Sequence, residues 1–287
     1  LFQRYRKRRD MKWKQWLLNP MSLRFPLVDP DDFLTRWAGK VAWIFSVWGA
    51  LLWVAVVGSA LLLAGQHWDE LTANLSDRVL ASTNLLMLAL LFPVIKALHE
   101  LGHGFAAKVW GGSVHEMGLM FLVLAPVPYV DASAAAAFPS KHRRAVVGAA
   151  GILVESFIAA LAMFAWVLVE PGAVRAVLFN TMLIAGISTV LVNGNPLLRF
   201  DGYFVLMDLI EMPNLGQRGQ AYLRLLSDRF VFGAKNTEPS REGADEKRWL
   251  FVYTVSSWVY RILITISIIL FIAGEFFIFG VLLALWS

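Results

Sequence analysis

One short run of the sequence has residue types and a spacing that could carry metal chemistry. It reads His99-Glu100-Leu101-Gly102-His103. Residues four apart lie on one face of a helix, so both imidazoles can turn toward a single metal ion. Glu100 lies about 100° round the helix from His99 and can reach a water at that metal without binding the ion. The spacing is typical of catalytic zinc sites, and the alternative is a chance pair at an exposed helix end.

A third metal ligand is needed, because a catalytic zinc takes three protein ligands and keeps one position open. The chain has no Cys and only five His, so only His or acidic side chains can complete the set. The candidates are His115, Glu116, Asp131, His142, Glu155 and Asp201. Asp201 is favoured because it follows the helix-breaking run Asn193-Gly194-Asn195-Pro196. Irregular backbone at membrane depth is tolerated only where it is buried in protein or lines a wet cavity. The alternative role of Asp201 is an N-cap of a helix or a partner for Arg199.

The composition indicates that these residues belong to a membrane protein. Of the 287 residues, 58% are hydrophobic and only 16% are charged, whereas soluble domains carry about 25% charged residues. This excludes an ordinary soluble enzyme, a disordered protein and a nucleic-acid-binding domain. The absence of Cys also excludes a disulfide framework, an Fe–S cluster and a thiolate nucleophile.

Apolar runs long enough to cross about 30 Å of hydrocarbon predict six transmembrane helices. The runs are 41–65, 79–95, 145–169, 176–192 and 249–287, the last expected to form two spans with a turn near Gly274. Between the second and third spans, apolar residues alternate over 113–125, which indicates a strand. The predicted fold is therefore an all-α polytopic membrane protein with a small β element. That element either caps the cytoplasmic side structurally or serves the active site.

The distribution of Lys and Arg sets the expected orientation. Residues 1–40 carry ten basic side chains, whereas the loop 66–78 carries three acidic side chains and one Arg. We therefore expect a cytoplasmic N-terminus and an external 66–78 loop. The expected organisation is a basic segment (1–40), a membrane core with the metal motif (41–201), a cytoplasmic loop (202–248) and C-terminal transmembrane helices (249–287) in a chain that continues further. Within the loop, 218–229 is predicted to form an amphipathic helix, either on the inner leaflet or packed on the protein.

Taken together, these motifs resemble the site-2 protease family of intramembrane zinc metalloproteases. The resemblance rests on H-E-L-G-H in one span and, about a hundred residues later, N-x-x-P-x-x-x-x-D-G in another. It implies that His99, His103 and Asp201 bind one zinc ion and that Glu100 is the catalytic acid and base. It also implies that Asn193 assists substrate or transition-state binding. In this family a small β structure near the active site is proposed to pair with an unwound substrate.

A narrower likeness points to the bacterial peptide zinc metalloprotease branch of that family. It is carried by Pro128-Tyr129-Val130-Asp131, Arg143-Arg144 and Leu198-Arg199-Phe200-Asp201-Gly202-Tyr203. Members of the branch often occur beside, or fused to, HlyD-type membrane-fusion proteins and export systems. The likeness implies a multi-pass protein of the bacterial cytoplasmic (inner) membrane.

One departure from the family pattern concerns the third span. Many members carry Gly-x-x-x-Asn there, whereas this chain has Gly151-Ile152-Leu153-Val154-Glu155. An ionised carboxylate cannot donate hydrogen bonds to a substrate carbonyl. Glu155 could instead pair with Lys96 or an Arg, hold the imidazole of a zinc ligand, or bind a substrate amine.

The leading hypothesis is an intramembrane zinc endopeptidase that hydrolyses membrane-embedded or membrane-inserted peptides. The alternative is a non-proteolytic subunit of a HlyD-type export assembly with a structural or vestigial zinc site. An intact Glu100 favours the enzyme, because a structural site needs no general base. An ion transporter is less favoured, because no inverted repeat is evident among the spans. The expected partners are lipid, a membrane-embedded peptide substrate and a HlyD-type protein, and no nucleic acid.

Overall fold

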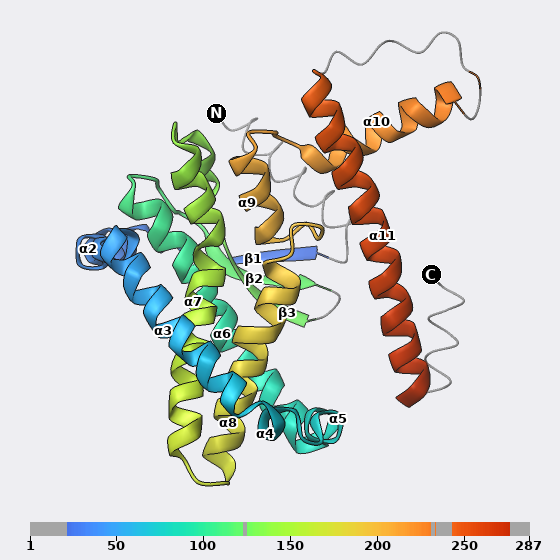
Figure 1. The fold of residues 1–287 in the computed structure, drawn as a ribbon. Coiled ribbons are helices and arrows are strands. Elements are labelled where there is room, and N and C mark those ends of the chain that lie inside the picture. Colours follow the sequence, from blue (N-terminus) through green and yellow to red (C-terminus); the bar gives the residue numbers. More distant parts are fainter. Residues whose placement is uncertain (1–21, 123–124, 231–232, 234–242, 276–287) are drawn as a thin grey trace. The chain divides into compact units, whose positions relative to one another are not determined.

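The computed structural model describes residues 22–122, 125–230, 233 and 243–275 (Figure 1). The chain divides into two compact units, residues 1–194 and 195–287, which are taken in turn. Within the described residues, five helices are long and apolar enough to cross a membrane. The predicted all-α polytopic membrane fold is therefore confirmed, and the part of the sixth predicted span after Glu275 lies outside the described residues.

The five candidate spans follow the predicted apolar runs. They are α3 (Val47–Gln66), α6 (Ser82–Val109), α7 (Lys141–Leu168), α8 (Ala173–Met182) with its π-helical continuation η3 (Leu183–Asn193), and α11 (Ala244–Glu275). Helix α6 continues well past the apolar run through the whole metal motif. Helix α11 includes Gly274, so any turn at that end lies beyond Glu275, outside the described residues.

The first unit contains an antiparallel sheet in the order β1-β2-β3. Strand β2 (Met117–Leu122) confirms the predicted β element, and β3 (Ala125–Val130) extends it into a hairpin. Strand β1 (Ser22–Val28) was not foreseen and comes from the basic N-terminal segment. It pairs with β2 so that Arg24 lies opposite Met120 and Phe25 opposite Leu119. Strand β3 is consequently an edge strand of this sheet.

Helix α2 (Asp31–Val41) anchors the same N-terminal segment to the first unit. Its Leu34 is fully buried, and both carboxylate oxygens of Asp31 accept hydrogen bonds from Lys108 Nζ at 2.7 Å. The backbone N–H of Val114 also donates to Asp31 Oδ1, at 2.9 Å. These hydrogen bonds, from Lys108 first, hold the pKa of Asp31 below its ordinary value. Residues 22–41 are therefore part of the fold.

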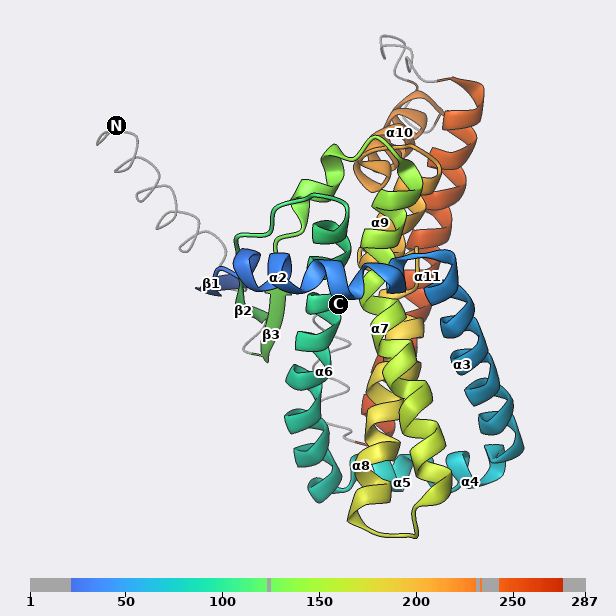
Figure 2. The same ribbon diagram turned by 90° about the vertical axis from the view of Figure 1, so that its left-hand side faces the viewer.

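Helix α7 is the central helix of the first unit and packs against α3, α6, α8 and η3 (Figure 2). It approaches α6 closely because both helices carry small residues where they meet. A Cβ at Gly102 would lie 2.9 Å from Val154 Cγ2 and 3.1 Å from the Ala150 carbonyl oxygen, closer than ordinary contacts allow. Small residues at such contacts are typical of membrane helix pairs.

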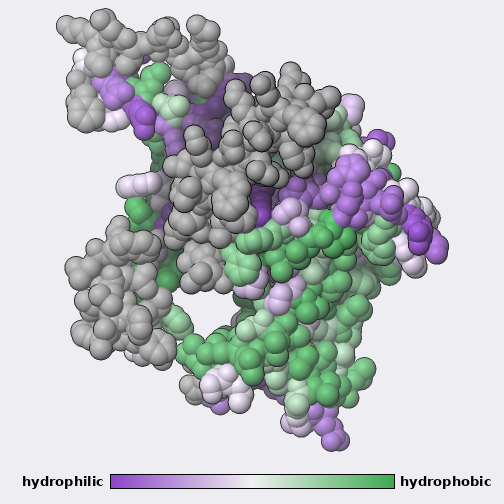
Figure 3. Space-filling model, turned by 180° about the vertical axis from the view of Figure 1, so that it is seen from behind, coloured by the Kyte–Doolittle hydropathy of each residue, from purple (hydrophilic) through white to green (hydrophobic). Residues whose placement is uncertain are grey.

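The outer surfaces of these helices are apolar. In Figure 3, hydrophobic side chains form a broad area over the helices of the first unit. Helix α3 buries only Gly49 and Ala60, whereas its large side chains such as Trp48 and Leu62 are exposed. Exposed apolar surface of this extent is expected to face lipid.

The second unit consists of α9 (Asp201–Leu209), α10 (Leu215–Phe230) and α11. Helix α10 confirms the predicted helix at 218–229 and extends it at the N-terminal end. It packs on α11 through a core formed by Tyr203, Met212, Leu215, Leu250 and Tyr253. An ion pair between Arg218 and Glu246, at 2.6 Å, ties the same two helices.

Candidate metal centre

Helix α6 presents both motif histidines to the interior of the first unit. His99 is 4% exposed and His103 is 8% exposed, which does not fit a chance pair at a solvated helix end. The helix continues uninterrupted through the motif, so the two rings lie one turn apart on the same face. Their Nε2 atoms are 3.1 Å apart.

The Nδ1 atom of each ring lies near an oxygen. His103 Nδ1 lies 2.7 Å from the Val147 carbonyl oxygen, which can only accept, so Nδ1 carries the proton. His99 Nδ1 lies within ion-pair distance of Glu155 Oε1, at 3.2 Å. The two Nε2 atoms face each other, either as donor and acceptor of one hydrogen bond or as two lone pairs that a cation can bridge.

A zinc ion fits this pair of nitrogens. With Zn–N bonds of about 2.0–2.1 Å and tetrahedral angles, two ligand nitrogens lie about 3.3 Å apart, close to the observed 3.1 Å. Zinc-binding histidines characteristically donate their other N–H to a carboxylate or a backbone carbonyl, as His103 does to the Val147 carbonyl. His99 has the Glu155 carboxylate 3.2 Å from its Nδ1. Donor set and spacing therefore agree with a divalent metal.

One stripe of α7 positions both rings. Val147, Gly151 and Glu155 follow each other at intervals of four, so they share a helix face. Val147 accepts from His103, and Glu155 lies against His99. Gly151 lies between them, and a Cβ added there would overlap the imidazole of His99. The glycine is therefore required by the close approach of the ring.

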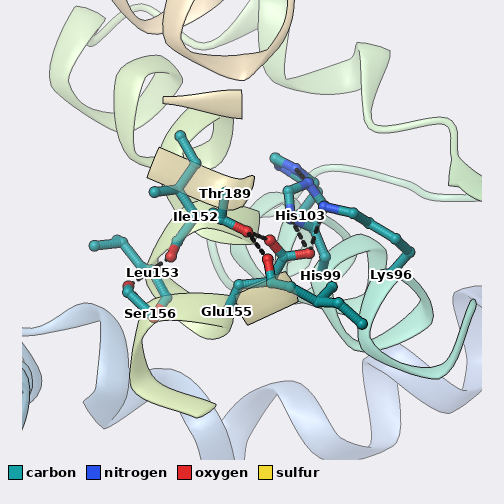
Figure 4. A network of polar contacts seen from close by, with 9 residues as sticks. Lys96, His99, His103, Ile152, Leu153, Glu155, Ser156 and Thr189 are labelled. Carbon is teal, nitrogen blue, oxygen red and sulfur yellow. Dashed lines mark hydrogen bonds and ion pairs between the residues drawn. The ribbon is translucent and has the colours of Figure 1, made fainter. Parts of the chain in front are cut away.

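Glu155 joins three elements through its carboxylate (Figure 4). Its Oε1 accepts a hydrogen bond from Lys96 Nζ at 2.7 Å and also faces His99. Its Oε2 accepts a short hydrogen bond from the Thr189 hydroxyl, which comes from η3. The side chain of Glu155 is fully buried and Lys96 is 8% exposed. Of the roles considered for Glu155, pairing with Lys96 and support of His99 match these contacts.

Glu100 is held by the edge strand of the sheet. Its Oε2 accepts a hydrogen bond from the backbone N–H of Val130, at 3.0 Å. Val130 ends β3, so the sheet fixes the carboxylate that follows the first histidine.

The alternative third ligands within the first unit are placed in other interactions. His115 pairs with Asp29 at 3.1 Å on the exposed surface, and Glu116 Oε1 accepts from the Tyr129 hydroxyl at 2.6 Å. Asp131 accepts from the backbone N–H of Ser133, at 3.0 Å. His142 is exposed in the first turn of α7.

The remaining predicted site residues flank the break between the two units. Asn193 is the last residue of η3 and is half-buried. π-Helix is rare, and its usual form, a single-turn bulge within an α-helix, is frequently found at functional sites. Asp201 is the first residue of α9, and Phe200 is the residue at the N-cap position, so the N-cap role considered for Asp201 is wrong.

An apolar cavity of about 460 Å³ lies in the first unit between α6, β3 and η3. Its wall consists of Leu88, Ala89, Phe92, Pro93, Pro126, Leu183, Ile184 and Ser188. Pro93 lacks the N–H that would bond the Ala89 carbonyl in a regular helix. The α6 side of the cavity is therefore formed where the helix ladder is incomplete, and the η3 side is π-helical.

Comparison with known proteins finds no matching family model, no matching curated protein and no matching solved structure. The function is therefore argued from the site. Sequence reasoning did not identify Val147, Thr189 and the backbone N–H of Val130 as supports of the motif. Spacing reveals residues on one helix, whereas these partners come from other elements and carry no motif of their own.

Proposed function

We propose that this chain is an intramembrane zinc metalloendopeptidase. The observation that carries the proposal is the buried pair of imidazoles on α6, with facing Nε2 atoms 3.1 Å apart and outer nitrogens directed at fixed oxygens. The pair lies on a helix long and apolar enough to cross a membrane. Ionisable groups within membrane-spanning helices are costly and usually functional.

His99, His103 and Asp201 would hold the metal. Asp201 is proposed as the third ligand because it follows the helix-breaking run at 193–196 in the sequence. Two imidazoles and one carboxylate make a donor set that suits zinc and leaves one position open. When bound, zinc acidifies a water molecule and polarises the scissile carbonyl.

Glu100 would act as general base and then as general acid. It follows a ligand directly, so it can face the open position without binding the metal. The Val130 N–H positions the carboxylate through Oε2, and the carboxylate would accept a proton and return it to the leaving amine. A site that only stabilised the fold would not need a positioned carboxylate here, which favours an enzyme over a scaffold.

The proposed substrate is an extended apolar peptide within or at the membrane. An edge strand can hold such a peptide through main-chain hydrogen bonds, and β3 is an edge strand. Every second residue of a strand directs its backbone N–H and C=O groups to the same edge. The Val130 N–H, on the unpaired edge of β3, points to Glu100. The same side at Pro126 and Pro128 offers carbonyls but no N–H, so a substrate would bind there through its own N–H groups. The apolar cavity beside Pro126 suits an apolar side chain.

The wider setting of the enzyme is part of the same proposal. The Lys and Arg distribution supports a cytoplasmic N-terminus. The family resemblance would place the chain in a bacterial inner membrane. Asn193 would donate its amide to substrate or transition state, and a HlyD-type export system would be the partner. In the opposing hypothesis, the chain is a non-proteolytic subunit of such a system.

Comparison of neo-N-termini in cells producing the native chain or Glu100→Gln tests the proposal. Gln keeps the oxygen that accepts from Val130 but removes the basic oxygen. We expect cleavage products within apolar segments of membrane proteins only with the native chain, at equal protein and zinc levels. Identical termini in both cells would overturn the protease and favour the scaffold.

A further inference from the structure

We propose that Lys96, Glu155 and Thr189 form a positioning clasp that fixes the His99 imidazole and thereby sets the metal affinity of the site. The inference rests on the proposed metal site but assigns these three residues a role of their own. None of them belongs to the H-E-x-x-H motif, and they come from three different elements, α6, α7 and η3.

The clasp is defined by what surrounds one carboxylate. Glu155 Oε1 is 2.7 Å from Lys96 Nζ and 3.2 Å from His99 Nδ1, and Oε2 accepts from the Thr189 hydroxyl. The carboxylate therefore has donors on both oxygens, which determines its rotamer and its direction. Figure 4 shows Lys96, His99 and Thr189 converging on Glu155.

The opposite charges of Lys96 and Glu155 cancel in the buried interior, where an isolated charge is costly. Desolvating an ion costs several kcal/mol even after relaxation, and a buried ion pair repays this only with good geometry and further hydrogen bonds. Lys96 neutralises Glu155, and Thr189 satisfies its second oxygen. A carboxylate can thus lie against His99 without adding net charge to the interior. Apolar residues of similar size would usually be as stable, so the pair is better explained by a role toward His99.

That role is to orient the ring. His99 has Gly151 against its ring, Glu155 3.2 Å from Nδ1 and His103 3.1 Å from Nε2, so contacts on three sides restrict the orientation of the ring. Lys96 and His99 lie three residues apart on α6, on the same side of the helix. Removal of the acceptor at Nδ1 would free the ring to turn and to exchange tautomers.

Two double variants separate support of His99 from simple packing. Lys96→Met with Glu155→Gln removes the charges but keeps an oxygen that can accept from His99. Lys96→Met with Glu155→Leu removes the charges and the acceptor. Partners of metal-binding histidines typically contribute 10–100-fold to metal affinity. We expect the Leu variant to bind zinc 10–100-fold more weakly and the Gln variant to stay within a few-fold of the native chain.

The measurement is the zinc dissociation constant of the full chain in detergent, by competition with a chelator, together with the visible spectrum of the Co²⁺ form. Lys108→Met is a matched control, because it breaks the ion pair to Asp31 on the same helix without touching either histidine. Ser156→Ala is a second control, because among the described residues that hydroxyl bonds the backbone of its own helix, at Ile152 and Leu153. Both controls should keep the native affinity and spectrum.

A second pair of variants tests the hydroxyl. Thr189→Val should weaken zinc binding and change the Co²⁺ spectrum, and Thr189→Ser should restore both. Native zinc affinity in the Leu double variant would overturn the clasp and leave the protease proposal intact. Weaker binding in both double variants and in Lys108→Met alike would also overturn it, because the effect would then follow general destabilisation. A native chain that binds no zinc would overturn the proposed function itself.

Discussion

Gly151 gives the sharpest test of the packing around the metal site. It lies on the stripe of α7 that faces the two histidines, and a Cβ at this position would overlap the His99 ring. We predict that Gly151→Ala abolishes stoichiometric zinc binding although it adds only one methyl group.

The size of the expected loss of zinc affinity follows from the small space available to the His99 ring. Ordinary carbon contacts are about 3.5–4.0 Å, so His99 would have to withdraw by more than about 1 Å. Metal sites hold their ligand distances within about 0.2 Å, and His99 is backed by Glu155 on its other nitrogen. We therefore expect zinc affinity to fall by at least about 100-fold, or about 2.7 kcal/mol.

The assay compares zinc content and zinc affinity of the purified full chains, with circular dichroism as the measure of folding. Gly58→Ala on α3 is the matched control, because a Cβ there meets nothing within 4 Å. Replacing Gly by Ala inside a helix favours the helix by about 1 kcal/mol, so loss of zinc in Gly151→Ala cannot come from helix propensity. A Gly151→Ala chain with one zinc and native affinity would refute the close packing of His99 on α7.

Three further predictions address topology, the third ligand and pH. Because the chain has no Cys, a single introduced thiol reports which side of the membrane its residue faces. Ala73→Cys should be labelled from outside and Arg224→Cys from the cytoplasmic side. The reverse labelling would overturn the predicted orientation. Asp201→Ala should lose zinc in elemental analysis, and retention of one equivalent would reassign the third ligand. Burial and the hydrogen bond to Glu116 raise the pKa of Tyr129 to about 12. The unfolded phenol ionises near 10, so this contribution to stability is complete below pH 10 and lost between pH 10 and about 12. In thermal melts, Tyr129→Phe should lack this loss of stability at alkaline pH. The same loss in Tyr129→Phe and in the native chain would contradict the assignment to Tyr129.

The sequence predicted the spans well because each depends on a local property. A run of apolar residues must form a helix in lipid, since no water is present to bond its backbone. The motif on α6 could be recognised for the same reason, because His99 and His103 are one turn apart on a single helix. The amphipathic pattern of α10 was likewise sufficient to place a helix.

The structural features that the sequence did not predict depend on contacts between residues far apart in the chain. Strand β1 forms because residues 22–28 meet β2 about ninety residues later, and its Pro26 weakened any strand pattern. Leu34 and Asp31 show the same limit, since their partners lie on α6 and at Val114. For Glu155, the sequence offered several roles, and only the positions of Lys96 and Thr189 distinguish among them.

The central claim is most directly tested by zinc content and peptide cleavage measured on the same samples. Native chain and Glu100→Gln would be reconstituted in lipid vesicles with a synthetic apolar transmembrane peptide, and products read by mass spectrometry. General acid–base help is typically worth 10²–10⁴-fold, so both chains should carry about one zinc while only the native chain cleaves the peptide measurably. Equal cleavage by the two chains, or a native chain without zinc, would contradict the account.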